Sequence, residues 1–556
     1  MTARSTVLPE RAANSELPGH PVNRSSRRRW LLLFISLVLV AAVVSRGIGK
    51  GEFSENVDET VHASTGLYVA SFLHDLPLRH PVEYTYRYYA QYPSLGIVMY
   101  PPIFYAVEGV AFYIFGATVV TARLTILFFA LLGLTFWFKL VNELEDEFTA
   151  ALSTVLLAFL PSVLNYEKVV MLDVPLMSLC IAASYFWVVY LRHGLYRHLY
   201  WFATFLCLAF LTKQHAIYLL LFCPLTLVLL KRWDRILNWR VLATAALTAL
   251  VVAPAYILQI FMNRSLALNI KGTAENAGMG WSYYWLRLPE LLGWSALAFS
   301  IVGIAIYLWR GNRENAIVML TWIFSCYVVF SMIRHKEARY ILYWVPAFAY
   351  FAVAPFTRKG TIPRLRPLTV GLVSLALVFS TVRAWGYQRL YVSGYAPLAQ
   401  QLTQREGGCV LIDMDLPGNF IFFMRAYDPA RRFVILRKAL YEIRTVREWG
   451  VTEFAHNQND VEQILKADSV RYVAIENDRP LYFPSQTALR QNVQNSGQYK
   501  LINTVPIESN LNGWQGRTLS VYESNTPVAP PQGVLHVKMS NLPHDIDIPF
   551  QQLIQK

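Results

Sequence analysis

The chain consists largely of long apolar blocks separated by short polar loops, and this pattern constrains its fold more than any other feature. Hydrophobic residues make up 55% of the 556 residues and charged residues only 15%, against about 25% charged in a typical globular chain. Several blocks approach the roughly 20 apolar residues that a helix needs to cross the membrane. The sequence therefore predicts a mainly α-helical, polytopic membrane protein and argues against a disordered, collagen-like, disulfide-stapled or cytosolic chain.

We predict eleven membrane-spanning helices. The block at 101–115 is left out because it opens with Pro101-Pro102 and carries Glu108; we expect it to lie in the membrane interface on the outer side. The predicted spans lie near 30–44, 121–140, 149–164, 174–191, 199–212, 216–230, 240–261, 289–309, 316–333, 338–356 and 368–385.

The basic residues predict the orientation of these spans. Residues 1–29 end in a cluster of arginines, and the first apolar block lacks a convincing signal-peptide cleavage site, so we expect a retained span that follows a cytoplasmic tail. With eleven spans, the basic loops share the side of this tail, as the positive-inside rule requires. The loop Glu143–Glu147, which is predicted to lie on the same side, is acidic and does not fit this pattern, but acidic residues carry little weight in the positive-inside rule. The basic loops are Arg192–Arg197, Lys231–Arg235, Arg310–Arg313 and Arg358–Arg366.

The apolar pattern breaks after about residue 386. The stretches 408–412 and Val470 to Ile475 look like short buried strands, and 454–467 looks like an amphipathic helix. We therefore predict two main parts, a spanning domain at 30–385 with a first outer loop at 47–120, and a small extracytoplasmic α/β domain at 386–556. The formal charge of +14 lies largely in the tail and in loops beside apolar blocks, which suits topology and lipid phosphate better than nucleic acid.

Several charged residues fall in the predicted outer loops. Asp58 and Glu59 follow the first span, where acids in a helix's first turn are also explained by capping and the helix dipole. Asp173 precedes Pro175, which is again typical of a helix start. Lys213 lies between two apolar runs, where a charge costs about 2.5–3.5 kcal/mol and usually has a function or partner. The alternative for Lys213 is snorkelling to the interface.

The segment RHKEARYILYWVPA, residues 334 to 347, places several basic residues at the start of the tenth predicted span. On the outer side such a cluster runs against the positive-inside trend and needs another reason. Arginine matches phosphate oxygens in a bidentate geometry, so the cluster predicts binding of an anionic lipid headgroup or a phosphate. Its Tyr and Trp residues are also explained by an interfacial aromatic belt.

An outer-loop Asp-Glu pair followed by YPPIFYA, LDVPLM, LTKQ and RYILYWVPA, in this order, resembles the GT-C superfamily of membrane glycosyltransferases. The likeness is to the family 39 branch, which contains protein O-mannosyltransferases and aminoarabinose-transferase-like bacterial enzymes, and it covers roughly residues 30–350. The resemblance implies an inverting transfer of one sugar from a polyprenyl-phosphate carrier to an acceptor on the extracytoplasmic face of a bacterial-type inner membrane. The acceptor is a protein, lipid or glycan.

The resemblance also assigns roles to the acids. Asp58 occupies the place of the proposed catalytic base, with Glu59 beside it, and Asp173 matches the acid of the second outer loop that shapes the cavity. No cofactor is predicted, because single-sugar members generally work without metal, although Asp58 and Asp173 could share a divalent ion as in the oligosaccharide-transferring relatives.

The cations take the complementary role. Lys213 and Arg339 match basic residues that contact the lipid phosphate, and Tyr340 lies next to that site. One departure is Met99-Tyr100, which stands where aminoarabinose transferases have an acidic-basic pair, and this lowers the expectation of lipid A as acceptor. The loop 263–288 offers Arg264, Lys271 or Arg287 as a candidate for another phosphate contact.

The residue types suit this chemistry. One carboxylate plus cations fits a single displacement on an activated glycosyl phosphate, whereas hydrolytic glycosidases pair two carboxyl groups. No metal-phosphate DxD motif or Gly-rich phosphate loop points to a nucleotide-sugar donor. The rival hypothesis is a transporter or channel-like protein whose intramembrane charges line a solute path. The long first outer loop, the clustering of charges on one face and the sizeable C-terminal domain favour the transferase.

Overall fold

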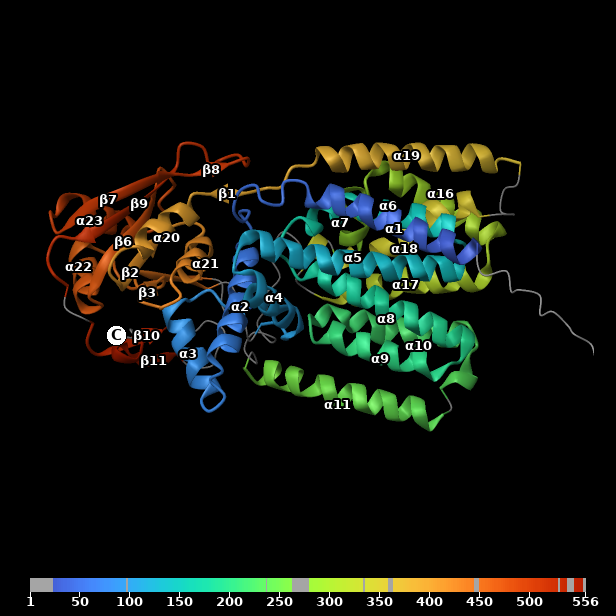
Figure 1. Ribbon diagram of the computed structural model, residues 1–556, viewed down its shortest axis with the longest axis horizontal. Coiled ribbons are helices and arrows are strands. Elements are labelled where there is room, and N and C mark those ends of the chain that lie inside the picture. Colours follow the sequence, from blue (N-terminus) through green and yellow to red (C-terminus); the bar gives the residue numbers. More distant parts are fainter. Residues whose placement is uncertain are drawn as a thin grey trace, which may run out of the picture.

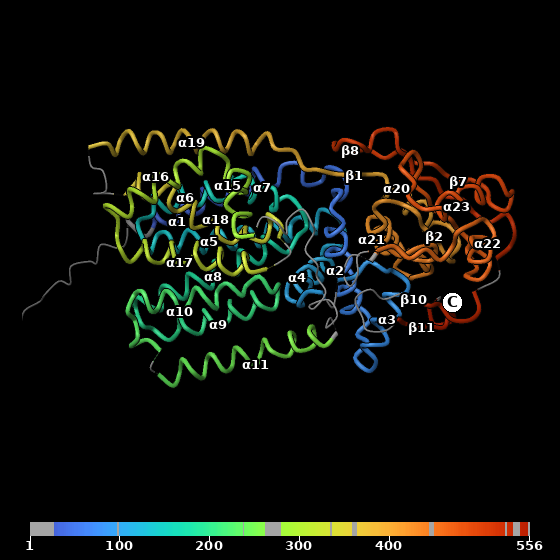
Figure 2. Tube along the Cα trace, turned by 180° about the vertical axis from the view of Figure 1, so that it is seen from behind, coloured from blue at the N-terminus to red at the C-terminus, as the bar shows by residue number. Residues whose placement is uncertain are grey.

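The structure is a computed structural model that describes residues 24–96, 99–236, 238–262, 280–333, 336–358, 364–444, 450–528, 531–537 and 545–553. It has two parts, a bundle of long helices and a domain that contains a mixed sheet (Figure 1). The segment 47–120, which is predicted to be the first outer loop, contributes helices between these parts, namely α2 (Val57–Asp75), α3 (Pro81–Gln91) and α4 (Ile103–Phe115). Figure 2 shows from behind that α2 crosses the ends of the bundle helices.

Seven helices in the described part are long and apolar enough to cross a membrane. They run side by side along the long axis of the molecule (Figure 1), and their apolar composition comes from the predicted blocks. They are α1 (Arg24–Ser45), α5 (Val119–Leu144), α8 (Asp173–His193), α11 (Trp239–Met262), α17 (Arg313–Met332), η4 (Ala338–Trp344) continued by α18 (Val345–Thr357), and α19 (Arg366–Gly386).

Two predicted spans are bent. The block at 149–164 forms α6 (Glu147–Phe159) and α7 (Pro161–Glu167), which meet at 69°, because Pro161 starts a new helix after an extended Leu160. The block at 289–309 is broken at Gly293, whose φ of 75° is a left-handed value that favours glycine. There α16 (Trp294–Arg310) meets the preceding helical segment at 116°. That segment contains η3 (Gly280–Ser282), α14 (Tyr283–Leu286) and α15 (Leu288–Leu292).

Counting each bent pair as one span gives up to nine in the described part. Reaching eleven requires two shorter segments, α9 (Tyr196–Phe210) and η1 (Gln214–Tyr218) continued by α10 (Leu219–Leu229), which is followed by η2 (Trp233–Arg235). These two segments lie beside α8 in Figure 1, but neither is among the long or bent spans counted above. The total of eleven spans therefore stays a prediction. Helix α4 has 13 residues, or about 20 Å at 1.5 Å per residue, which is too short to cross the bilayer.

The C-terminal part is the expected α/β domain. Its five-stranded sheet has the order β3-β2-β6-β9-β7, with β2 parallel to β3 and β6, and β9 antiparallel to β6 and β7. The two predicted strands are β2 and β6. The predicted amphipathic helix begins at Gln458, because the Asn457 side chain caps it by accepting from the Asp460 N–H. The sheet strands are β2 (Gly408–Asp413), β3 (Phe433–Leu436), β6 (Val470–Asn477), β7 (Tyr499–Pro506) and β9 (Thr518–Ser524).

The remaining elements of this domain are four helices, three strand pairs and one 3-10 turn. The helices are α20 (Tyr395–Thr403), α21 (Pro417–Tyr427), α22 (Gln458–Ala467) and α23 (Pro484–Asn495). The antiparallel pairs are β1 (Val392–Ser393) with β8 (Glu508–Ser509), β4 (Tyr441–Arg444) with β5 (Gly450–Glu453), and β10 (Val534–Val537) with β11 (Ile546–Pro549), followed by η5 (Phe550–Gln552).

The first outer loop is tied to both parts of the molecule. The buried Glu52 carboxylate accepts hydrogen bonds from the N–H groups of Gly394, Tyr395 and Ala396, at 3.0, 3.1 and 3.0 Å, around the start of α20. The Arg123 guanidinium of α5 binds backbone carbonyls of the same loop, including that of Ile48 at 2.7 Å. These contacts fix the point at which α2 begins, directly above the ends of the spanning helices.

Candidate active site

Asp58 lies in the first turn of α2 but does not cap it. The capping residue is Asn56, whose side chain accepts from the Asp58 N–H at 3.0 Å. The Asp58 carboxylate instead accepts a hydrogen bond from Nη1 of Arg339 at 2.9 Å. Since the Asp58 side chain is 38% exposed, it combines a fixed position with access to solvent.

Arg339 lies between two carboxylates. It belongs to η4, and the residue that precedes this helix is Glu337. Nε of Arg339 is 2.6 Å from a Glu337 oxygen, and the Tyr340 hydroxyl donates to the other Glu337 oxygen at 2.9 Å. Glu337 therefore positions both Arg339 and Tyr340.

Lys213 and Asp173 form a buried ion pair. Nζ of Lys213 is 2.8 Å from Oδ1 of Asp173, and the side chains are 3% and 0% exposed, so Lys213 does not snorkel to water. The Tyr343 hydroxyl donates to the same oxygen at 3.2 Å. Among the described residues, Oδ2 of Asp173 has no hydrogen-bond partner. The chain holds Lys213 in an extended conformation between α9 and η1.

Aromatic rings join the two ion pairs into one cluster. The Tyr340 ring centre is 5.9 Å from Nζ of Lys213 and 5.7 Å from the Arg339 guanidinium carbon. The Tyr100 ring centre is 5.8 Å from the same Lys213 nitrogen. The structure therefore brings together Asp58, Asp173, Lys213, Arg339 and Tyr340, five of the six site residues that the sequence predicts.

Glu59 does not join this cluster. Its buried carboxylate accepts from the Ser54 N–H at 3.0 Å and from the Val170 N–H at 2.8 Å. Both oxygens are thus used to join the first outer loop to the second. This contact places Val170, and with it the following α8, relative to α2.

Besides Tyr100, three residues of the cluster have no role predicted from sequence. Glu337 and Tyr343 bind predicted residues, and their only sequence signal is their place beside Arg339 and Tyr340. The third is His62, whose Nδ1 lies 2.9 Å from the Tyr105 hydroxyl and whose ring packs against Tyr100. His62 follows Asp58 by four residues, so the helical period puts both on one face of α2.

Burial of His62 predicts that the fold loses stability in acid. Burial lowers the pKa of His62 to about 4, while the nearby Asp58 opposes this shift. Because the folded pKa lies below the usual value, protonation favours the unfolded state. Stability should be complete above about pH 6.5 and fall by about 3 kcal/mol as the pH drops to 4. His62→Asn should flatten thermal stability against pH in this window; an unchanged slope would contradict this assignment.

Other predicted basic residues do not reach the cluster in the described part. Arg334, His335, Arg264 and Lys271 lie outside the described residues. Arg287 pairs with Glu290 at 3.2 Å.

An apolar groove of about 530 Å³ runs between α9, α10 and α11. Phe210 and Leu219, which flank the Lys213 turn, both line it. Beyond the groove, near the C-terminal end of α11, the Gln259 side chain donates to the Met99 carbonyl at 2.5 Å, next to the Tyr100 that faces Lys213. The groove therefore leads toward the charged cluster.

Two family models match parts of the chain. The dolichyl-phosphate-mannose-protein mannosyltransferase model matches residues 100–258, and the Alg9-like mannosyltransferase family model matches residues 276–414. No curated protein sequence matches the chain significantly.

Solved structures share the fold. ArnT from Cupriavidus metallidurans in the apo state is 15% identical with a TM-score of 0.59, over 89% of this chain and 98% of that one. The same protein bound to undecaprenyl phosphate is 14% identical with a TM-score of 0.56 and the same coverage. The Archaeoglobus fulgidus oligosaccharyltransferase in complex with Zn and sulfate is 13% identical with a TM-score of 0.53, over 80% of this chain and 68% of that one.

These similarities favour the transferase over the transporter. Both matching families are glycosyltransferases, and together their matched segments include most of the helical bundle. The shared fold extends into the C-terminal domain, since 89% of this chain is covered. The chain is an integral membrane glycosyltransferase that is similar in sequence to two mannosyltransferase families and in fold to ArnT.

Proposed function

We propose that this enzyme transfers a single sugar from a polyprenyl-phosphate donor to an acceptor on the extracytoplasmic face, with inversion at the anomeric carbon. The observation that carries the proposal is the convergence of Asp58, Lys213 and Arg339 around the Tyr340 ring. The fold shared with ArnT bound to undecaprenyl phosphate supports this class of donor.

The two cations are the groups that would hold the donor phosphate. Each is already paired with a carboxylate, Arg339 with Asp58 and Lys213 with Asp173. An incoming phosphate therefore competes with these carboxylates, and Asp58, which is the more exposed of the two, is the one that yields. Loss of the Arg339 bond frees Asp58 to act as a base, so donor binding prepares the enzyme for the acceptor.

The transfer is then a single displacement. The acceptor hydroxyl oxygen bonds to the anomeric carbon while the bond from that carbon to the phosphate oxygen breaks. The hydroxyl proton passes to Asp58, and the bonding electron pair leaves with the polyprenyl phosphate. Lys213 and Arg339 stabilise the growing charge on that phosphate; one donor in a preorganised site of this kind contributes about 2.7–4 kcal/mol.

A metal ion is not required in this scheme. Asp58 and Asp173 each have a cationic side chain as counter-charge, and these cations supply the positive charge that a divalent ion would bring to the phosphate. We therefore propose that transfer continues when divalent ions are removed.

We propose that the polyprenyl tail lies in the groove between α9, α10 and α11. A bulky substitution at Ala245, which lines the groove, should block the tail. Ala245→Trp is expected to raise the KM for a long-chain donor about tenfold, in keeping with the loss of about 1.4 kcal/mol of apolar contact. The control is Leu247→Trp, because Leu247 is 61% exposed on the same helix and does not line the groove. Equal KM values for the two variants would exclude this groove.

The site is proposed to face the extracytoplasmic side. Single cysteines introduced near residues 235 and 400 should be labelled from opposite sides of sealed vesicles by a membrane-impermeant reagent. Labelling of both from one side would overturn the proposed sidedness.

The experiment that tests the function is incubation of the purified protein with a panel of polyprenyl-phospho-sugars, followed by mass spectrometry. Release of polyprenyl phosphate that depends on an acceptor and on Asp58 is the expected result. Turnover of nucleotide sugars without lipid donor would contradict the proposal.

A further inference from the structure

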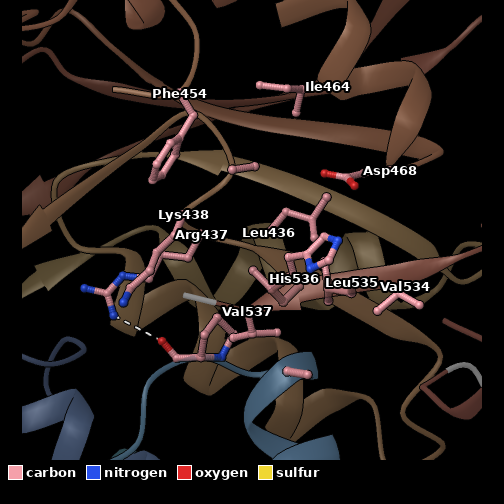
Figure 3. A pocket seen from close by; sticks show the side chains of 14 residues that line it. Leu436, Arg437, Lys438, Phe454, Ile464, Asp468, Val534, Leu535, His536 and Val537 are labelled. Carbon is pink, nitrogen blue, oxygen red and sulfur yellow. Dashed lines mark hydrogen bonds between the residues drawn. The ribbon is translucent and has the colours of Figure 1, made fainter. Parts of the chain in front are cut away.

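A second cavity lies outside the helical bundle, between α3 and the C-terminal domain. Its volume is about 200 Å³, and its walls come from α3, the end of β3, α22 and β10 (Figure 3). Since one water occupies about 30 Å³ of liquid, this space suits one small ligand rather than an extended chain.

Arg437 gives the cavity its charge. It directly follows β3, at the carboxyl end of a parallel strand pair, where α/β sheets commonly bind ligands. Its guanidinium donates one hydrogen bond, to the Pro93 carbonyl at 3.2 Å, and no carboxylate among the described residues forms an ion pair with it. Burial lowers the pKa of Arg437 below its usual value, as expected for a cation without a counter-charge.

The neighbouring side chains already have acidic partners. Lys438 pairs with Glu442 at 2.8 Å, and Nδ1 of His536 lies 2.6 Å from an Asp547 carboxylate oxygen. An anion that enters the cavity would therefore find its counter-charge at Arg437.

The side of the cavity opposite Arg437 carries an acidic residue, Asp468. Asp468 lies across the cavity from the Arg437 guanidinium, with Leu436 and Val537 between them (Figure 3). Burial raises the pKa of Asp468. This carboxyl is placed to accept a hydrogen bond from a hydroxyl or amine group at the opposite end of a ligand.

We propose that this cavity is a binding site for a small polar ligand that carries a carboxylate or a phosphate, with its anionic group on Arg437. The site is separate from the Lys213–Arg339 cluster and does not depend on the proposed transfer reaction.

Binding to the full-length protein in detergent tests the proposal by calorimetry. The probes are glucuronate and glucose 1-phosphate, which separate carboxylate from phosphate recognition, with glucose as the neutral control. At least one anion should bind at least about tenfold more tightly than glucose, because hydrogen bonds to charged groups contribute about 1.5–3 kcal/mol. Arg437→Gln should remove this preference, whereas Arg405→Gln should keep it, since Arg405 is an exposed arginine of the same domain that pairs with Glu523. Absence of any anion preference, or its persistence in Arg437→Gln, would overturn the site.

A second measurement does not require a folded variant. Phenylglyoxal labelling of the wild-type protein, mapped by mass spectrometry, should show that the favoured anion protects Arg437 about fivefold or more while Arg405 stays reactive. Equal labelling of Arg437 with and without anion would contradict the proposal.

Discussion

Replacing Asp58 with asparagine is expected to lower the rate of sugar transfer by about 10²–10⁴-fold, the usual contribution of a positioned general base. Donor affinity should stay the same or rise, because the substitution removes the carboxylate that competes with the phosphate for Arg339. The two quantities are measured separately, transfer by product formation and affinity by binding of the lipid donor. A simple loss of folding would lower both.

The matched control is Glu55→Gln. Glu55 is an acid of the same loop, and it accepts from the Trp514 indole N–H at 3.3 Å without touching the cluster. Its replacement should change transfer by less than about tenfold. Near-normal transfer by Asp58→Asn would remove Asp58 as the base, and a marked loss of donor binding would show that it contacts the donor instead.

Replacing Lys213 with methionine is expected to have two separable effects. Transfer should fall by about 10²–10³-fold through loss of one charge-stabilising donor. Stability should also fall by about 3–5 kcal/mol, because Asp173 is left buried without its counter-charge. Both are measured on the same preparation, by product formation and by thermal unfolding.

The double variant Lys213→Met with Asp173→Asn separates the effects. Removing both charges should restore most of the thermal stability, since no unpaired buried charge remains. Transfer should remain low, because the phosphate still lacks a cation. Recovery of transfer along with stability would show that Lys213 has only a structural role.

The membrane class and the charged cluster could be predicted from sequence for physical reasons. A charge in an apolar run is costly unless it has a partner, so the position of Lys213 in the sequence predicts a partner or a function, and the structure supplies Asp173 as the partner. Arg339 stood out for a similar reason, as a basic residue on the predicted outer side. The predicted order of spans and loops places these residues on one membrane face.

Details below the level of the helix could not be predicted. Asp58 and Glu59 are adjacent in sequence, but the 100° between successive helical residues sends one to Arg339 and the other to Val170. The bend at Gly293 depends on a left-handed backbone conformation, which the apolar composition of its block does not reveal. Glu337 binds both Arg339 and Tyr340 only because the folded turn brings the three side chains together, and its place in the sequence does not reveal this role.

The most direct test of the central claim is an experimental structure of the protein with undecaprenyl phosphate. The phosphate should lie within about 4 Å of both Lys213 Nζ and the Arg339 guanidinium, with the Arg339–Asp58 bond broken and the tail between α10 and α11. A phosphate bound elsewhere, with both ion pairs intact, would contradict the account.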